Sequence, residues 1–148
     1  MRHTARSATS HAPDAGQPQV ERITINGELA ALMIRAGSVG DGAQFVTPDD
    51  ATLQVGILSH RGGTDVGRHV HIPLERQVTG TAEVLIVQSG CCAIDVYDGD
   101  VLVATRELGP SDIAVLYRGG HNLRVLEDTV LIEVKQGPYL GIEEKIRY

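Results

Sequence analysis

The sequence predicts an all-β protein made of short antiparallel strands. Apolar runs recur along most of the chain, and Gly, Asp, Asn or Pro residues typical of turns separate them. No segment of ten or more residues shows the 3.6-residue apolar period of an amphipathic helix. Asp98-Gly99 stands between two apolar runs, which favours a tight hairpin. Many short strands at this spacing predict a sandwich or a closed barrel.

The N-terminal segment differs from the rest of the chain. Residues 1–20 are rich in Ala, Ser, Pro and Gly and show no periodicity, so we expect a disordered tail. Residues 21–148 are then expected to form a single domain, since a chain of 148 residues can bury one hydrophobic core.

The expected strands follow one another with turn residues at their ends. In chain order they cover residues 22–25, 28–35, 51–59, 64–72, 82–89, 91–97, 101–107, 112–117, 122–126 and 129–135. The turn signals are Asn26-Gly27, Gly40-Asp41-Gly42, Gly62-Gly63, Ser89-Gly90, Asp98-Gly99-Asp100, Gly109-Pro110 and Gly119-Gly120.

Several of these strands are apolar on both faces. They contain Val84-Leu85-Ile86-Val87, Val101-Leu102-Val103 and Val130-Leu131-Ile132. Because a small antiparallel sheet usually keeps one face in water, we expect another sheet or a second subunit to cover the outer face. The pattern therefore predicts a homodimer.

Composition narrows the range of partners. The formal net charge of -6 and the absence of a Lys/Arg run argue against binding nucleic acid. No apolar run approaches the roughly 20 residues that span a bilayer, so no membrane partner is expected. Arg2 and Arg6 are not followed by the apolar stretch of a secretory signal, and a cytoplasmic location is predicted.

Three histidines and a carboxylate stand in separate strand-like segments. His69 and His71 are two residues apart, so on a strand both rings project from one face. Glu83 begins a later strand, and His121 follows Gly119-Gly120. Such a set suits one divalent transition metal: Fe, Mn, Zn or Ni.

These motifs resemble those of the cupins, which are small jelly-roll β-barrels. Their first motif is a Gly, an H-x-H and a Glu with a Gly seven positions later, matched by Gly62-Gly63, His69-Val70-His71 and Glu83 with Gly90. Their second motif, a late His after a Pro-containing turn, is matched by Gly109-Pro110 and His121. The resemblance covers about residues 50–135. It implies a jelly-roll barrel whose metal is held by His69, His71, Glu83 and His121.

The chain departs from the family pattern in places. The gap between His71 and Glu83 is longer than usual, and Glu75 within it fits a shorter H-x-H-x3-E spacing, so two carboxylates compete for the ligand role. Pro73 is expected to end the strand and leave Glu75 in a loop, which favours Glu83. In the second motif, Tyr117 replaces the usual Pro.

The C-terminal segment carries a second resemblance. Glu133-Val-Lys-Gln-Gly-Pro-Tyr139 is similar to a segment of small cupins associated with cell-surface sugar and nucleotide-sugar gene clusters. Glu133 and Lys135 share one face of the expected strand. The pattern leaves open whether they form an interior ion pair or a solvated surface pair.

The functional expectation is a metal-dependent enzyme for a small polar substrate, sugar-like or carboxylate, with isomerase, epimerase or lyase chemistry. The same ligands would support an Fe(II)-dependent dioxygenase, and a non-catalytic cupin that binds a small ligand is the third hypothesis. Glu75 and Tyr117 are the candidate catalytic residues, as general bases beside the metal.

Overall fold

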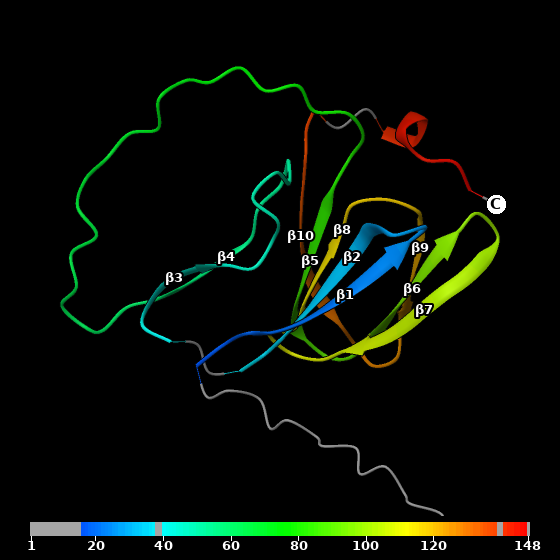
Figure 1. Cartoon of the computed structure of the whole chain (residues 1–148). Helices are drawn as coiled ribbons and strands as arrows, with labels where there is room; N and C mark the ends of the chain where they lie inside the picture. Colours follow the sequence, from blue (N-terminus) through cyan, green and yellow to red (C-terminus); the bar gives the residue numbers. More distant parts are fainter. Residues whose placement is uncertain (1–15, 38–39, 139–140, 148) are drawn as a thin grey trace, which may run out of the picture.

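The computed structural model describes residues 16–37, 40–138 and 141–147. These residues form ten strands and one short 3-10 helix, which confirms the all-β prediction (Figure 1). The elements are β1 (Gln19–Ile25), β2 (Glu28–Arg35), β3 (Gly42–Phe45), β4 (Gly56–Ser59), β5 (Glu83–Ser89), β6 (Cys92–Asp98), β7 (Val101–Leu108), β8 (Ile113–Leu116), β9 (Gly120–Val125), β10 (Val130–Lys135) and η1 (Gly141–Glu144).

The strands form three antiparallel sheets. The largest has the order β1-β2-β8-β5-β10, a second has the order β7-β6-β9, and β3 and β4 pair with each other. Within the described residues no helix is long and apolar enough to cross a membrane. The two larger sheets share no backbone pairing, so the described residues form an open sandwich rather than a closed barrel.

The main hydrophobic core lies between the two larger sheets. Met33 and Leu85 enter it from the five-stranded sheet, and Ile94 and Val96 enter it from the three-stranded sheet. All four side chains are buried. Burying each of these side chains stabilises the fold by about 1.5–3 kcal/mol, so this core holds the two inner faces together.

A second apolar cluster covers the outer face of the five-stranded sheet. Val84 and Val115 are buried there against residues 46–57, which include the start of β4 and the chain that precedes it. The apolar outer face of β5 is therefore covered by this same chain and requires no second subunit. The homodimer itself stays a prediction.

Most expected strands are present, and the differences lie in the first half of the domain. β1 begins at Gln19, inside the segment predicted as a tail, while residues 1–15 lie outside the described residues. Only Gly56–Ser59 of the expected strand 51–59 is a strand, and β3 was not predicted. The prediction of a strand over 64–72 is wrong for this structure, because residues 60–82 have no regular secondary structure.

Local chemistry explains why residues 64–72 do not form an isolated strand. Gly63 and Gly67 have positive φ angles of 86° and 69°, outside the extended region. The Gly67 amide donates to Asp65 Oδ1 at 2.8 Å, which closes a local turn. Pro73 has no amide to donate to a ladder. An extended segment here therefore needs a neighbouring strand to hold it.

Candidate metal site between the two sheets

Glu83 and His121 face each other across the inside of the sandwich. Glu83 is the first residue of β5 and pairs with Leu116 of β8, whose side chain belongs to the main core. His121 is the second residue of β9 and pairs with Val96, another core residue. His121 Nε2 lies 3.1 Å from Glu83 Oε2. The fold thus brings together two of the four predicted ligands.

The surroundings of this pair suit a metal centre. Glu83 is 7% exposed, and a buried carboxylate is costly unless a donor or a cation faces it. The side chain of His121 is 36% exposed, so the pair lies at the border of the interior. Two ligands bonded to one metal at about 2.1 Å lie about 3.0–3.4 Å apart. The observed separation therefore fits two neighbouring ligands as well as a hydrogen bond.

Gly119 fixes the chain that leads to His121. Its φ is 80°, which side chains rarely tolerate, and a Cβ atom there would lie 2.5 Å from the Tyr97 carbonyl oxygen and 2.7 Å from Ile25 Cδ1. Only glycine can make this close approach without a shift of its neighbours. The turn signal Gly119-Gly120 is thus confirmed, and it sets the point at which β9 begins.

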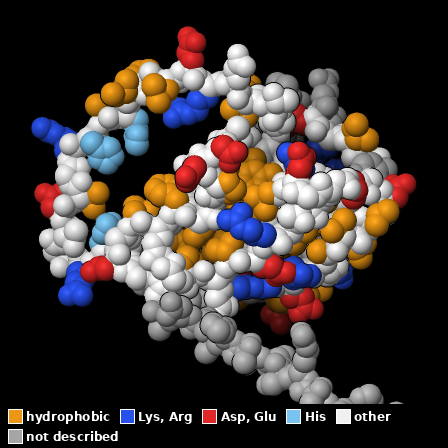
Figure 2. Space-filling view, viewed as in Figure 1, with side chains coloured by type: hydrophobic (Ala, Val, Ile, Leu, Met, Phe, Trp, Pro, Cys, Tyr) orange, Lys and Arg blue, Asp and Glu red, His pale blue; other side chains and the backbone are white. Residues whose placement is uncertain are grey.

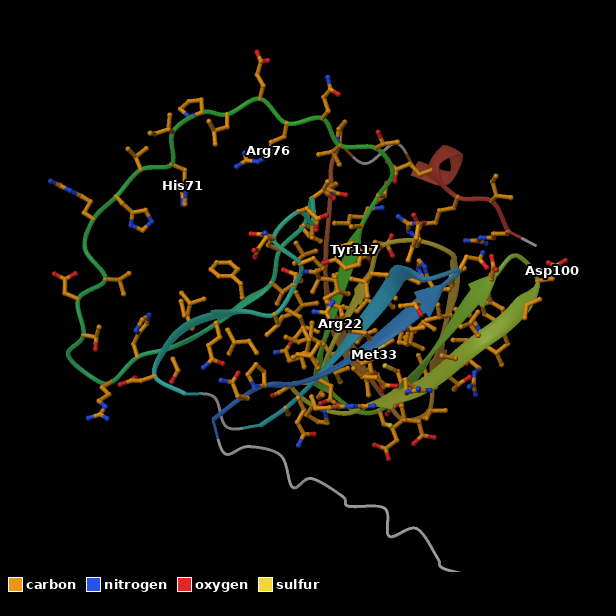
Figure 3. All side chains as sticks on the ribbon, in the orientation of Figure 1. Arg22, Met33, His71, Arg76, Asp100 and Tyr117 are labelled. Carbon is orange, nitrogen blue, oxygen red and sulfur yellow. The ribbon has the colours of Figure 1, made fainter. Side chains whose placement is uncertain are left out.

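His69, His71 and Glu75 lie on the segment 60–82, which is exposed as far as Thr81. Figures 2 and 3 show histidine side chains along this loop, with His71 and Arg76 well outside the strands. The rings of His69 and His71 meet edge to face, with centroids 5.3 Å apart. The two rings contact each other on a segment that is not a strand, so the shared strand face expected from the H-x-H spacing is not formed in this structure.

The structure does not bring this H-x-H pair to Glu83 and His121. Among residues 16–37, 40–138 and 141–147, no three His, Cys, Asp or Glu side chains gather closely enough to hold a metal. The predicted ligand set is thus divided into a preformed half on the sheets and a half on the loop.

Glu83 and His121, the half on the sheets, lie on the open side of the sandwich. In the sheets described above, β9 pairs only with β6, and β10 pairs only with β5. Leu123 and Val125 share the inner face of β9 with His121 and are exposed. An unpaired strand edge offers backbone donors and acceptors to a further strand, so this side can accept one.

Lys135 is the third polar group of this region. β10 pairs Lys135 with Glu83, so both side chains lie on the inner face of the sheet. Lys135 Nζ lies 3.2 Å from Glu144 Oε2 of η1. Although burial lowers it, the Glu144 carboxylate raises the pKa of Lys135 above its usual value, with help from the charges of Glu83 and Glu133. Lys135 is therefore a half-buried cation that pairs with Glu144, whereas Glu133 is exposed.

Tyr117 lies elsewhere. It packs against the outer cluster, on the face of the sheet opposite to Glu83, and its hydroxyl donates to the Leu53 carbonyl at 3.0 Å. Burial raises the pKa of Tyr117. The geometry does not support its role as a general base beside the metal. His60, which the motifs leave aside, follows β4 and is exposed.

Sequence patterns missed Glu144. Strand alternation places Lys135 on the inner face of β10. Its partner Glu144, however, belongs to η1, which begins six residues after the end of β10. The acidic pair Glu143-Glu144 near the C-terminus was the only available signal. It has no spacing that ties it to a strand.

Comparisons of the chain with protein-family models, with curated proteins and with solved structures found no match. The functional proposal therefore depends on the side chains and their geometry.

Proposed function

We propose that this chain is a metal-binding cupin in which His69 and His71 join Glu83 and His121 around one divalent transition metal. The observation that carries the proposal is the 3.1 Å contact between His121 Nε2 and Glu83 Oε2 at the open side of the sandwich. The contact joins residues of two sheets that the sequence motifs select independently.

The loop is long enough to complete the site. Eleven residues separate His71 from Glu83, and an extended chain of that length reaches about 36 Å. A strand formed by residues 64–72 beside β9 would place His69 and His71 on one face, toward the interior. It would extend the sheet β7-β6-β9 and close the sandwich toward the jelly-roll barrel of the cupins.

The exposed state of the loop also supports this docking. Residues 60–82 carry Val66, Val70, Ile72, Leu74 and Val78 as exposed large hydrophobic residues. Loops of more than about 15 residues without secondary structure are uncommon in compact domains and are often functional. A segment that docks and binds metal accounts for both features.

The residues define the chemistry of such a centre. A bound divalent metal would supply Lewis-acid polarisation of a substrate oxygen. Three neutral imidazoles and one carboxylate leave net positive charge on the centre, which favours an anionic or hydroxy-carbonyl ligand. Glu83 and His121 would supply neighbouring ligand atoms, and the exposed hydrophobic residues of β9 would exclude water once covered. Glu75, four residues after His71 on the same loop, would act as the general base once the loop is docked.

The proposed activity is isomerase, epimerase or lyase chemistry on a small sugar-like or carboxylate substrate. When these reactions proceed by proton transfer, they remove a proton from a carbon beside a carbonyl group. We therefore expect metal-loaded protein in D₂O to exchange that proton in a keto-sugar, a nucleotide-sugar or a sugar acid, followed by proton NMR.

The matched control is His69→Ala/His71→Ala, which should exchange nothing above the metal-only rate. Exchange by wild type alone supports the proposal. No exchange or turnover across the three substrate classes with metal-replete protein contradicts the enzymatic assignment. Oxygen uptake that depends on iron and on one of these substrates would replace it with a dioxygenase.

A further inference from the structure

Lys135 is a permanent cation beside the proposed centre. It lies on the inner face of β10 next to Glu83, and its side chain is only 16% exposed. Glu133, two residues earlier, lies on the same face of the strand. Near Lys135 the strands thus provide two carboxylates, and a metal held by Glu83 would offset the charge of one of them.

Glu144 reaches this cation from outside the sheets. It ends η1, a single 3-10 turn, and its side chain is 15% exposed while it contacts Lys135 Nζ at 3.2 Å. A one-turn 3-10 helix has few backbone hydrogen bonds and yields more readily than a strand. Glu144 is therefore the carboxylate of this region that can move without disturbing a sheet.

A hollow adjoins the ion pair. It has a volume of about 390 Å³ and is lined in part by Glu144, by Gln136 of the chain after β10, and by Thr81 just before β5. This volume lies in the range of small-molecule sites. Thr81 and Gln136 offer hydrogen-bonding groups to a polar ligand, and Glu144 both lines the hollow and contacts Lys135.

We propose that Lys135 binds the anionic group of the ligand in place of Glu144, so that the site takes small molecules that carry a carboxylate or a phosphate. The ligand occupies the hollow, its anionic group displaces the Glu144 carboxylate from Lys135, and its polar body extends toward Glu83 and His121. This inference rests on the proposed metal centre for the other end of the ligand.

Charge explains the selectivity for anions. Exchange of the Glu144 carboxylate for the anionic group of a ligand leaves Lys135 paired, whereas a neutral ligand would leave Lys135 with Glu144 and gain nothing from the ammonium group. Glu144 also lowers the apparent affinity, because a ligand must compete with an internal group. Removal of Glu144 should therefore tighten the binding of anions.

The test is calorimetric titration of inorganic phosphate, gluconate and neutral sorbitol into metal-loaded wild type, Glu144→Gln, Lys135→Gln and Lys135→Arg. Glu127→Gln, at an exposed acidic residue after β9, is the matched control. We expect Glu144→Gln to bind the anions about fivefold more tightly and Lys135→Gln about tenfold more weakly. Lys135→Arg should keep most of the affinity, and sorbitol should not distinguish the variants.

The same titrations in metal-free Glu83→Gln protein separate this proposal from the metal centre. In this variant the neutral amide of Gln replaces the Glu83 carboxylate, whose charge a metal would otherwise offset. We therefore expect anions to displace Glu144 from Lys135 even when the protein binds no metal. The proposal is overturned if Glu144→Gln behaves as Glu127→Gln, if Lys135→Gln binds anions as wild type does, or if no variant binds either anion. Tighter binding of gluconate than of phosphate would identify the carboxylate as the preferred group.

Discussion

Each of the two open sides of the sandwich has a glutamate that faces a basic side chain of the other sheet, but the basic residue differs. On the side where β1 faces β7, Arg106 Nε donates to Glu21 Oε1 at 2.8 Å and to Oε2 at 2.9 Å. On the side of β9 and β10, His121 faces Glu83 at 3.1 Å. Each pair joins the five-stranded sheet to the three-stranded sheet, so both occupy equivalent structural positions.

The cation differs between the two pairs, and this difference suits the Arg106–Glu21 pair to a structural role, called the clamp below, and the His121–Glu83 pair to metal binding. Arginine stays charged and binds a carboxylate with a fork of donors, but it is not a metal ligand. Histidine is a common metal ligand and changes charge near neutral pH. The arginine pair is also more exposed, with side chains 36% and 40% accessible, whereas the side chain of Glu83 is 9% accessible. Glu83 is therefore the less exposed of the two carboxylates and faces the weaker cation, which is the arrangement that the proposed metal site requires.

The largest effect expected from this comparison is on metal affinity. Glu83→Gln removes the buried carboxylate ligand and should weaken metal binding about 100-fold or more. Glu21→Gln, the matched change on the opposite side, should leave affinity within about twofold. Competition with a chromophoric chelator measures both. Equal losses in the two variants would show that the comparison is wrong.

A third ion pair sets the scale for a purely structural role. Asp95, 4% exposed on the outer face of β6, accepts from Arg124 Nε at 2.8 Å and from Thr105 at 2.6 Å. Asp95→Asn should reduce the free energy of unfolding by about 1–3 kcal/mol, measured by urea denaturation, and should leave metal content unchanged. Loss of metal from Asp95→Asn would show that Asp95 does not have a purely structural role.

The same carboxyl group makes stability depend on acid pH. Hydrogen bonds from Arg124, and then from Thr105, lower the pKa of Asp95 to about 2, below the value of about 3.9 in an unfolded chain. A depressed pKa in the folded state contributes stability that is fully present above about pH 4 and is lost as the pH falls toward 2. Urea midpoints between pH 5 and pH 2.5 should therefore decrease less in Asp95→Asn than in wild type. Parallel decreases would contradict this assignment.

Docking of the loop should be visible by proteolysis. Arg61, Arg68 and Arg76 lie in the exposed segment 60–82 and are cut by trypsin when that segment is undocked. Metal that draws the loop onto β9 should slow this cleavage about tenfold. Cleavage after the exposed Lys145 is the internal control. Protection that persists in His69→Ala/His71→Ala would show that the histidines do not cause the docking.

The clamp itself should contribute modestly. Arg106→Gln removes the contact with Glu21, which also holds the pKa of Glu21 below its usual value. Because both side chains are partly exposed, the expected loss of stability is only about 0.5–1 kcal/mol. Thermal denaturation with unchanged metal content would confirm a structural clamp. A loss of metal would assign a functional role to this side of the sandwich.

The smallest effect is expected for Glu75. Glu75→Gln should leave metal content unchanged, because Glu83 is the buried carboxylate that faces His121. If Glu75 is the general base, the variant loses proton exchange in the assay above. If the metal content of Glu75→Gln falls while that of Glu83→Gln does not, Glu75 is the metal ligand and Glu83 is not.

Sequence patterns predicted most of the strands because period-2 alternation and turn residues are local signals. β2 matches the expected range 28–35, β7 and β10 differ from theirs by one residue at one end, and β6 is shifted by one residue. The pattern failed at 64–72, since a strand needs a partner and Gly67 and Pro73 weaken it locally. The contact between Glu83 and His121 follows from two motifs, whereas the pair of Lys135 with Glu144 depends on how η1 packs after β10.

The most direct test of the central claim is elemental analysis of protein purified without oxygen, with wild type compared to His69→Ala/His71→Ala and to Glu21→Gln. The account predicts close to one equivalent of a divalent transition metal in wild type and in Glu21→Gln, and almost none in the double variant. Equal metal content in all three proteins, or none in any of them after reconstitution, would contradict a site that joins the loop histidines to Glu83 and His121.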